Sequence, residues 1–221
     1  MYTKEVQPRR ILVVADIHGQ AKALKEALES AKFEPQKGDW LIMLGDLIDR
    51  GYDSKGTLDI AMELVKQGNA LVVRGNHEQM AIDAYSSGDF SHWFANGGKV
   101  THQQILGNKK YIDFMTSMPL IHFYDSFVFI HAGLNPKIPI ANQTPRDLLW
   151  IREPFIFNKV DLDSLIVVGH TPVQFLPSKD SIPVRYHNKL FMDTGAAFGN
   201  FGKVTVYDLY SKEYWQAQCV S

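Results

Sequence analysis

Short apolar runs alternate with amphipathic stretches through the first third of the chain. The runs 11–15, 40–44 and 70–73 are rich in Val, Ile and Leu, which predicts buried strands of an α/β sheet. Between them, apolar residues recur three and four positions apart, as on the buried face of a helix: Leu24, Ala27, Leu28 and Ala31, then Leu58, Ala61, Met62 and Val65. Ser54 is the expected N-cap of the second helix, and Gly68-Asn69 is its expected end. This alternation predicts βαβ units with right-handed crossovers.

The pattern changes after residue 85. Residues 86–107 are irregular and rich in glycine, which favours a small cap over residues 86–118, with a plain surface loop as the alternative. A proline-rich loop covers much of 131–164. The further expected strands are 120–124 and 127–130, which form a hairpin, then 165–168, 190–192, 203–209 and 214–217. We therefore expect a single domain over residues 1–221, in which these later strands form a second mixed sheet that packs on the first.

Composition limits the classes of protein that fit. The chain has 221 residues, is 45% hydrophobic and carries a net charge of −1, so it can bury a full core and has no electrostatic bias towards nucleic acid or an anionic membrane. No apolar run approaches the roughly 20 residues that span a bilayer. The single cysteine, Cys219, excludes an intramolecular disulfide. We expect a cytoplasmic protein that binds neither nucleic acid nor membranes.

Polar side chains follow the predicted strands directly. They are carboxylates, imidazoles and one amide, without a thiolate: Asp16, His18, Asp46, Asn76, His131 and His170. This ligand set suits Mn, Fe or Zn. Six ligands are too many for one open catalytic ion, and they fit two ions about 3.5–4 Å apart that share one carboxylate and solvent. A hydroxide bridging two such ions is a nucleophile at neutral pH, and the paired charge favours in-line displacement at phosphorus.

Five short motifs, each at an expected strand end, carry a resemblance to a known family. They are Asp16-Ile17-His18-Gly19, Gly45-Asp46 to Arg50-Gly51, Gly75-Asn76-His77-Glu78, His131-Ala132-Gly133 and Gly169-His170. In this order they resemble the calcineurin-like metallophosphoesterases, and within them the phosphoprotein phosphatase branch, notably the small bacterial and phage enzymes of the lambda type. The resemblance runs from about Ile11 to Gly195. It implies an α/β sandwich of two packed mixed sheets flanked by helices, with a dimetal site at the strand ends.

The resemblance also implies how the metal ligands divide between two divalent ions. The first ion would take Asp16 and His18, and Asp46 would bridge. The second ion would be completed by Asn76, His131 and His170. Manganese is the favoured metal, with iron and zinc as alternatives.

The other matching residues would act on the substrate. His77 would be the general acid that protonates the leaving oxygen, and Asp49 would orient it, since a carboxylate on one ring nitrogen fixes the tautomer of the imidazole. Arg50 and Arg152 would bind the phosphoryl oxygens with planar, bidentate donors. One departure is Ala15, where the family usually has glycine.

The activity implied is that of a metal-dependent phosphomonoesterase, and a serine/threonine protein phosphatase acting on phosphorylated proteins or peptides is the leading reading. A symmetrical dinucleoside tetraphosphate hydrolase is the alternative, because it shares the metal motifs but usually lacks the aspartate at the position of Asp49. A non-catalytic scaffold on the same fold is the remote alternative, since such relatives lose metal ligands or the acid histidine.

Several other residues are expected to be structural. Isolated histidines are usually surface or core residues, and we read four of them so: His92, His102, His122 and His187. Arg74 is expected to be a structural charge and Asp193-Thr194 a turn at a strand end. Trp150, Phe155 and Phe157 are expected to pack rather than to line a peptide groove.

Overall fold

The computed structural model describes residues 7–177 and 181–220. Within these residues, the first sheet has five strands in the order β10-β9-β1-β2-β3. The strands are β1 (Arg10–Val14), β2 (Asp39–Met43), β3 (Ala70–Val72), β9 (Lys203–Asp208) and β10 (Tyr214–Gln218). β1, β2 and β3 run parallel, as the βαβ pattern predicts, and β9 pairs antiparallel with β1.

The second sheet also has five strands over the described ranges, in the order β4-β5-β6-β8-β7. They are β4 (Ile121–Tyr124), β5 (Phe127–Ile130), β6 (Leu165–Val168), β7 (Val184–Tyr186) and β8 (Lys189–Phe191). The three inner strands are parallel, and β4 and β7 run antiparallel at the two edges. The sequence did not predict β7, because this strand is short and half-exposed at an edge and contains no apolar run.

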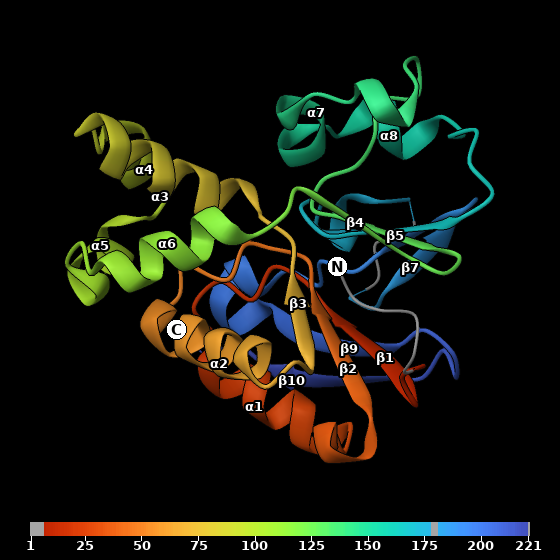
Figure 1. Cartoon of the computed structure of the whole chain (residues 1–221), viewed down its shortest axis with the longest axis horizontal. Coiled ribbons are helices and arrows are strands. Elements are labelled where there is room, and N and C mark those ends of the chain that lie inside the picture. Colours follow the sequence, from red (N-terminus) through yellow and green to blue (C-terminus); the bar gives the residue numbers. More distant parts are fainter. Residues whose placement is uncertain (1–6, 178–180, 221) are drawn as a thin grey trace.

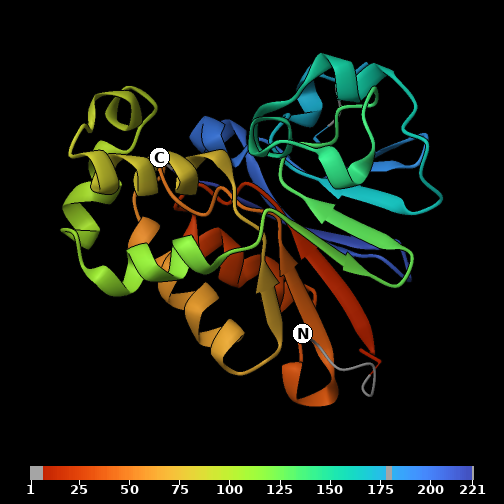
Figure 2. The ribbon, with the colours of Figure 1, turned by 45° about the horizontal axis from the view of Figure 1, so that its top comes forward.

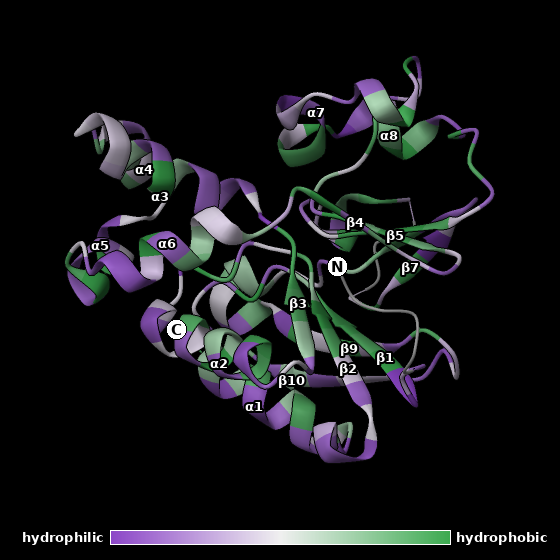
Figure 3. Ribbon diagram, in the orientation of Figure 1, coloured by the Kyte–Doolittle hydropathy of each residue, from purple (hydrophilic) through white to green (hydrophobic). Residues whose placement is uncertain are grey.

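The two sheets pack face to face, as predicted. Alternate residues of a strand point to opposite faces, and in β1 Ile11 and Val13 meet Phe129 and Val167 of the second sheet in one buried cluster. The strands β1, β2 and β3 are accordingly hydrophobic along most of their length (Figure 3). Helices α1 (Ala21–Ser30) and α2 (Ser54–Lys66) cover the outer face of the first sheet, and α7 (Pro145–Trp150) and α8 (Glu153–Phe157) cover that of the second (Figures 1 and 2).

Residues 86–118, which we call the cap segment, are helical rather than irregular. They contain α4 (Ser91–Ala95), α5 (Lys99–Ile105) and α6 (Lys109–Ser117), which follow α3 (Asn76–Ser87) and form one group with it beyond β3 (Figure 1). Apolar residues of this group, Trp93 and Tyr111 among them, join the cluster behind the first sheet. The helices are short because glycines separate them, which is why a helical period does not show in the sequence. That the cap segment is a cap on a single domain stays a prediction.

Two further expectations need correction. The N-cap of α2 is Asp53, whose carboxylate accepts a hydrogen bond from the Gly56 amide at 2.8 Å, and Ser54 is the first helical residue. The proline-rich loop contains α7 and α8, because Pro145 and Pro154 stand in the first turns of helices, where the missing amide proton costs nothing. Short 3₁₀ turns complete the chain at Pro35–Lys37, Ile140–Asn142, Val173–Phe175 and Ala196–Phe201.

The C-terminal hairpin β9-β10 belongs to the first sheet and not to the second. It extends the first sheet beside β1, so that strands from both ends of the chain are neighbours. The Gln20 side chain secures this return, donating to the Val220 carbonyl at 2.9 Å and accepting from the Val220 amide at 3.2 Å. Among the described residues, none of the helices is both long and apolar enough to cross a membrane.

Candidate active site

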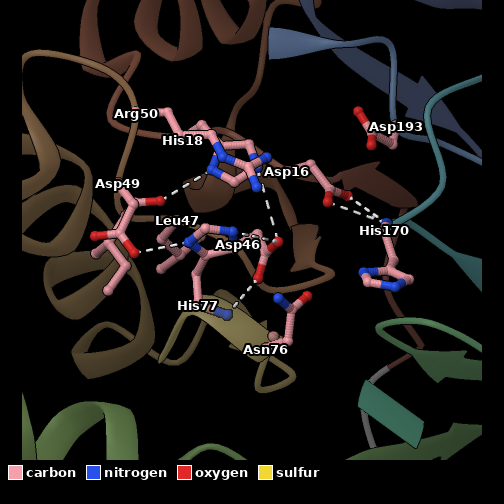
Figure 4. Close-up of polar contacts among 12 residues, drawn as sticks. Asp16, His18, Asp46, Leu47, Asp49, Arg50, Asn76, His77, His170 and Asp193 are labelled. Atoms are coloured by element: carbon pink, nitrogen blue, oxygen red, sulfur yellow. Dashed lines mark hydrogen bonds and ion pairs between the residues drawn. The ribbon is translucent and has the colours of Figure 1, made fainter. Parts of the chain in front are cut away.

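Loops that follow β1, β2, β3, β5 and β6 meet at one place, and they bring the six predicted ligands together. Backbone bonds join the first two loops, where the His18 amide donates to the Asp46 carbonyl at 2.9 Å. Side chains join the others: Asp46 accepts from the His77 amide at 3.0 Å, and Asp16 accepts from the His170 amide at 2.9 Å (Figure 4). All six predicted ligands are buried. The carboxyl ends of parallel strands therefore form the site, as the sequence predicts.

Asp46 lies at the centre of the cluster. One oxygen, Oδ2, is 3.7 Å from His18 Nε2, and the other, Oδ1, is 3.5 Å from His131 Nε2. Within the described ranges, two groups of side chains have donor atoms close enough to hold a cation, and both contain Asp46: His18, Asp46 and His77, and Asp46, His131 and His170. A carboxylate that faces a different imidazole with each oxygen has the geometry of a bridging ligand.

The neighbours of the imidazoles turn one ring nitrogen of each towards the cluster. His18 Nδ1 is 3.0 Å from the Ile48 carbonyl and His131 Nδ1 is 2.8 Å from the Leu44 carbonyl, so both rings donate from Nδ1 and present a lone pair at Nε2. His131 Nε2 then faces Asn76 Oδ1, a second acceptor, at 2.8 Å. Within the described part of the chain, His170 Nε2 is buried and has no hydrogen-bond partner. Two acceptors that face each other, and a buried acceptor that lacks a donor, are both explained if a cation binds between them.

The charge state of these residues also fits metal binding. Burial lowers the pKa of His18 to about 3 and lowers the pKa of His131 and of His170, so these imidazoles are neutral at pH 7, as metal ligands must be. Burial, together with the negative charges of Asp193 and Asp46, raises the pKa of Asp16 well above its ordinary value. Crowded carboxylates are costly without a counter-ion, and divalent cations would offset that cost.

His77 and Asp49 form a buried pair beside this cluster. His77 Nδ1 is 2.7 Å from Asp49 Oδ2, while Nε2 of the same ring faces Asp46 Oδ2 at 4.0 Å (Figure 4). Burial lowers the pKa of His77, but the charge of Asp46 and the hydrogen bond to Asp49 outweigh it, so the pKa of His77 is raised. The imidazole therefore points Nε2 towards the cluster and is readier than a free histidine to carry a proton there.

The two predicted phosphate-binding arginines line the same cavity, whose volume is about 280 Å³. Arg50 follows Asp49 in the loop after β2, and its Nη1 is 3.4 Å from His18 Nε2. Arg152 precedes α8 and donates from Nη1 to the His170 carbonyl at 2.9 Å and to Thr171 Oγ1 at 3.1 Å. Both guanidinium groups flank the cavity, where they could contact a bound anion.

Two other acidic residues lie at the site without having been predicted to belong to it. Glu78 accepts hydrogen bonds from the backbone amides of Asp46, Leu47 and Gly75 at 2.8–2.9 Å, which fixes two of the ligand loops to each other. Its place three residues after Gly75, as in a capping box, was the available signal. Asp193 makes the expected turn, since it accepts from the Gly195 amide at 2.9 Å, but it also lines the cavity, and burial raises its pKa to about 7.

Several residues read as structural behave so. His102 packs among aromatic rings, with Phe90 at 4.8 Å and a hydrogen bond to the Tyr85 hydroxyl at 2.9 Å. Arg74 donates to the Thr116 and Met118 carbonyls. Two of the three aromatic residues expected to pack are exposed instead: Trp150 is 39% exposed and lies on the wall of the site cavity, and Phe157 is 55% exposed. Phe155 is fully buried, as expected.

A glycine pair offers a direct test of how tightly the ligand loops pack. Gly45 has φ +85°, and a Cβ there would lie 2.4 Å from the Gly75 amide nitrogen, whereas Gly68 has φ +79° and open space around it. Alanine at either position costs roughly 1–2 kcal/mol of backbone strain. Gly45→Ala should in addition push the Gly75–Asn76 backbone away from Asp46, and lower both metal content and hydrolysis on the order of tenfold or more.

The matched control is Gly68→Ala, which should lower thermal stability without changing metal content or the rate of hydrolysis. Thermal unfolding, metal analysis and hydrolysis rates of the two variants give the comparison. Equal activity in the two variants would show that the loops tolerate the displacement.

Comparisons with known proteins agree with this geometry. The family model described as calcineurin-like phosphoesterase matches residues 9–207. The chain is 33% identical to serine/threonine-protein phosphatase 1 of Salmonella typhimurium, over 90% of this chain and 91% of that protein. It is 25% identical to an asymmetrical bis(5'-nucleosyl)-tetraphosphatase of Oceanobacillus iheyensis, over 93% and 90% of the two chains.

Solved structures show the same fold. A cold-active protein-tyrosine phosphatase of a psychrophilic Shewanella aligns with a TM-score of 0.65 at 17% identity, over 96% of this chain and 81% of that one. The fold, the convergent strand-end ligands and the family match agree, and the chain belongs to the calcineurin-like phosphoesterase family of hydrolases, whose members use divalent metal ions.

Proposed function

We propose that this metallophosphoesterase is a serine/threonine protein phosphatase. The observation that carries the proposal is the buried His77–Asp49 pair, with Nδ1 and Oδ2 2.7 Å apart and Nε2 facing the ligand cluster. A serine alkoxide is a poor leaving group and needs a proton as the P–O bond breaks, which a histidine so placed can donate. The similarity to the Salmonella enzyme over nearly the whole chain supports the same substrate class.

Each residue of the site has a part in this proposal. Asp16, His18, Asp46, Asn76, His131 and His170 would hold two divalent ions, with Asp46 shared. When bound, such ions would supply positive charge near the phosphoryl group and lower the pKa of a water molecule that attacks it. Arg50 and Arg152 would bind and orient the phosphoryl oxygens. His77 would hold a proton at Nε2 and give it to the departing oxygen, while Asp49 keeps the ring in place. Manganese is the metal we propose.

The surroundings of the site leave room for a peptide. A second cavity, of about 740 Å³, lies between α3, α4 and α7, and it shares Trp150 with the site cavity. Arg146 on the wall of this second cavity is exposed, and among the described residues it has no hydrogen bond or ion pair. A phosphorylated segment of protein could thus extend from the site along α7. The cytoplasmic location predicted from composition stays a prediction.

The relative named a bis(5'-nucleosyl)-tetraphosphatase keeps a second function open, the hydrolysis of dinucleoside tetraphosphates. The alternative written from sequence is the symmetrical reaction. The presence of Asp49 disfavours the symmetrical reaction, because the symmetrical hydrolases usually lack an aspartate at this position. A scaffold without activity is disfavoured because every ligand position and the His77–Asp49 pair are filled.

The test is a direct competition between substrate classes. Phosphoserine peptides and diadenosine tetraphosphate are offered at equal concentration to the manganese-loaded protein, and phosphate and nucleotide release are measured. We expect the peptides to have the higher kcat/KM. A tenfold advantage for the dinucleotide, about 1.4 kcal/mol of transition-state preference, would replace the leading function with the second one.

A further inference from the structure

The carboxylate of Asp49 accepts hydrogen bonds from two side chains, those of His77 and Trp93. Its Oδ2 atom is 2.7 Å from His77 Nδ1 and also 2.7 Å from Trp93 Nε1. Asp49 is fully buried, and His77 and Trp93 are each 1% exposed. The other carboxylate oxygen, Oδ1, is buried and has no hydrogen-bond partner among the described residues. A buried negative charge needs donors, and these two N–H groups are the side-chain donors that Asp49 has here.

The indole has little freedom to move. Trp93 lies on α4 in the cap segment, and a Cβ at Gly98 would come within 2.3 Å of its Nε1. The rings of Tyr85, Phe94 and His102 surround it, with centroids 5.8, 6.0 and 6.2 Å away. The position of the N–H is therefore set by packing within the cap segment and by the glycine at 98.

The cap segment holds the backbone of Asp49 as well. Asp49 and Arg50 have φ values of 73° and 67°, a left-handed conformation that costs roughly 1–2 kcal/mol per residue outside glycine. The Asp49 amide lies 3.1 Å from Thr101 Oγ1 of α5 and 3.0 Å from Ser54 Oγ, and both oxygens accept from it. Gly97 packs against the side chain of Arg50, where a Cβ would lie 3.0 Å from Cγ.

From these contacts we propose that Trp93 is a positioning residue for hydrolysis. Its indole N–H holds the Asp49 carboxylate, Asp49 holds the His77 imidazole, and His77 Nε2 is thereby aimed at the leaving-group oxygen. The proposal rests on the role proposed for His77. It gives the cap segment a share in catalysis through geometry, although Trp93 itself touches neither the substrate nor the ligand cluster.

The experiment uses Trp93→Phe in the metal-loaded full-length protein, which keeps a ring in place and removes the N–H. We expect kcat on a phosphoserine peptide to fall on the order of tenfold, the usual weight of one charge-assisted hydrogen bond. KM and metal content should not change. Nitrophenolate departs from nitrophenyl phosphate without needing a proton, so hydrolysis of this substrate should fall less than that of the peptide. Gly98→Ala, which displaces the indole, should give the same pattern if Trp93→Phe does not fold.

The matched control is Phe114→Leu, which disturbs the packing of the cap segment at a ring that, among the described residues, has no ring contact with Trp93. It should lower thermal stability and leave the ratio of the two substrates unchanged. The second measurement is a double-variant cycle. In a protein that already carries Asp49→Asn, adding Trp93→Phe should not lower kcat on the phosphoserine peptide any further, because the indole acts through that carboxylate.

Two results would overturn the inference, and they are separable from failure of the proposed function. If Trp93→Phe reduces both substrates equally, or adds its full effect on top of Asp49→Asn, the indole has only a packing role. The proposed function stands in that case, provided that His77→Asn still lowers kcat more on the phosphoserine peptide than on nitrophenyl phosphate. If His77→Asn does not discriminate either, the acid role of His77 fails, and the role of Trp93 fails with it.

Discussion

Replacing His77 by Asn should lower kcat on phosphoserine peptides by about 10²–10⁴-fold, the usual contribution of general acid catalysis. Metal content should stay the same, since His77 turns Nδ1 to Asp49 and the six ligands remain. Nitrophenyl phosphate has a good leaving group and should lose much less. Asp49→Asn should show the same dependence on substrate, but weaker, because it only misorients the imidazole. The measurement is kcat for both variants on both substrates.

His187→Asn is the matched control, because this histidine is exposed on the turn between β7 and β8 and has a φ of 55°, which Asn tolerates. It should leave both rates unchanged. Equal losses on the two substrates in His77→Asn, with metals retained, would mean that His77 acts on something other than the leaving group, for example on the nucleophile.

Replacing Asp46 by Asn should be the most damaging change to a ligand. The two oxygens of Asp46 face His18 and His131 separately, so the substitution weakens both halves of the cluster at once. We expect the variant to lose hydrolysis of every substrate, nitrophenyl phosphate included, and to bind fewer than two ions. A chelator should likewise abolish hydrolysis by the native protein, and added manganese should restore it. Elemental analysis and rates on the same samples give the result.

Asp53→Asn serves as the comparison, because this aspartate caps α2 and contacts none of the six ligands. Asn is an equally good N-cap, so stability and activity should both persist. Elemental analysis that finds a single ion in the fully active native enzyme would contradict the two-metal site, and the assignment of Asp46 as a bridge would go with it.

The sequence was most informative where the evidence was local. Each ligand follows an apolar run directly, and an apolar run followed by a polar, glycine-containing turn marks the end of a buried strand without any knowledge of the rest of the fold. Parallel strands then bring such ends to the same edge, so Asp16, Asp46 and Asn76 could be placed together before the structure was known. The roles assigned to them remain predictions that the variants above address.

The sequence was least informative where a contact joins distant segments. Nothing near Trp93 shows that its N–H reaches Asp49, which lies 44 residues earlier. The same holds for Asp193, whose turn is visible in sequence but whose place in the cavity is not. The hairpin β9-β10 was assigned to the wrong sheet because strand pairing depends on which sheet edge is open, and this is a property of the assembled fold.

The pairing of β1 with β9 sets the order in which the protein can be completed during synthesis. β1 is synthesised long before β9, one of its two neighbours in the sheet, which begins at Lys203. The hydrogen bond from the Gln20 side chain to the Val220 carbonyl can form only later still. Until β9 pairs with it, β1, the strand that leads into Asp16 and His18, has an open edge, which is prone to pairing with other chains. Closing so long a loop also slows folding, because the entropy is lost before the contacts form. The loop that carries two of the six predicted ligands, Asp16 and His18, is thus secured only after the strands of the second sheet have been synthesised.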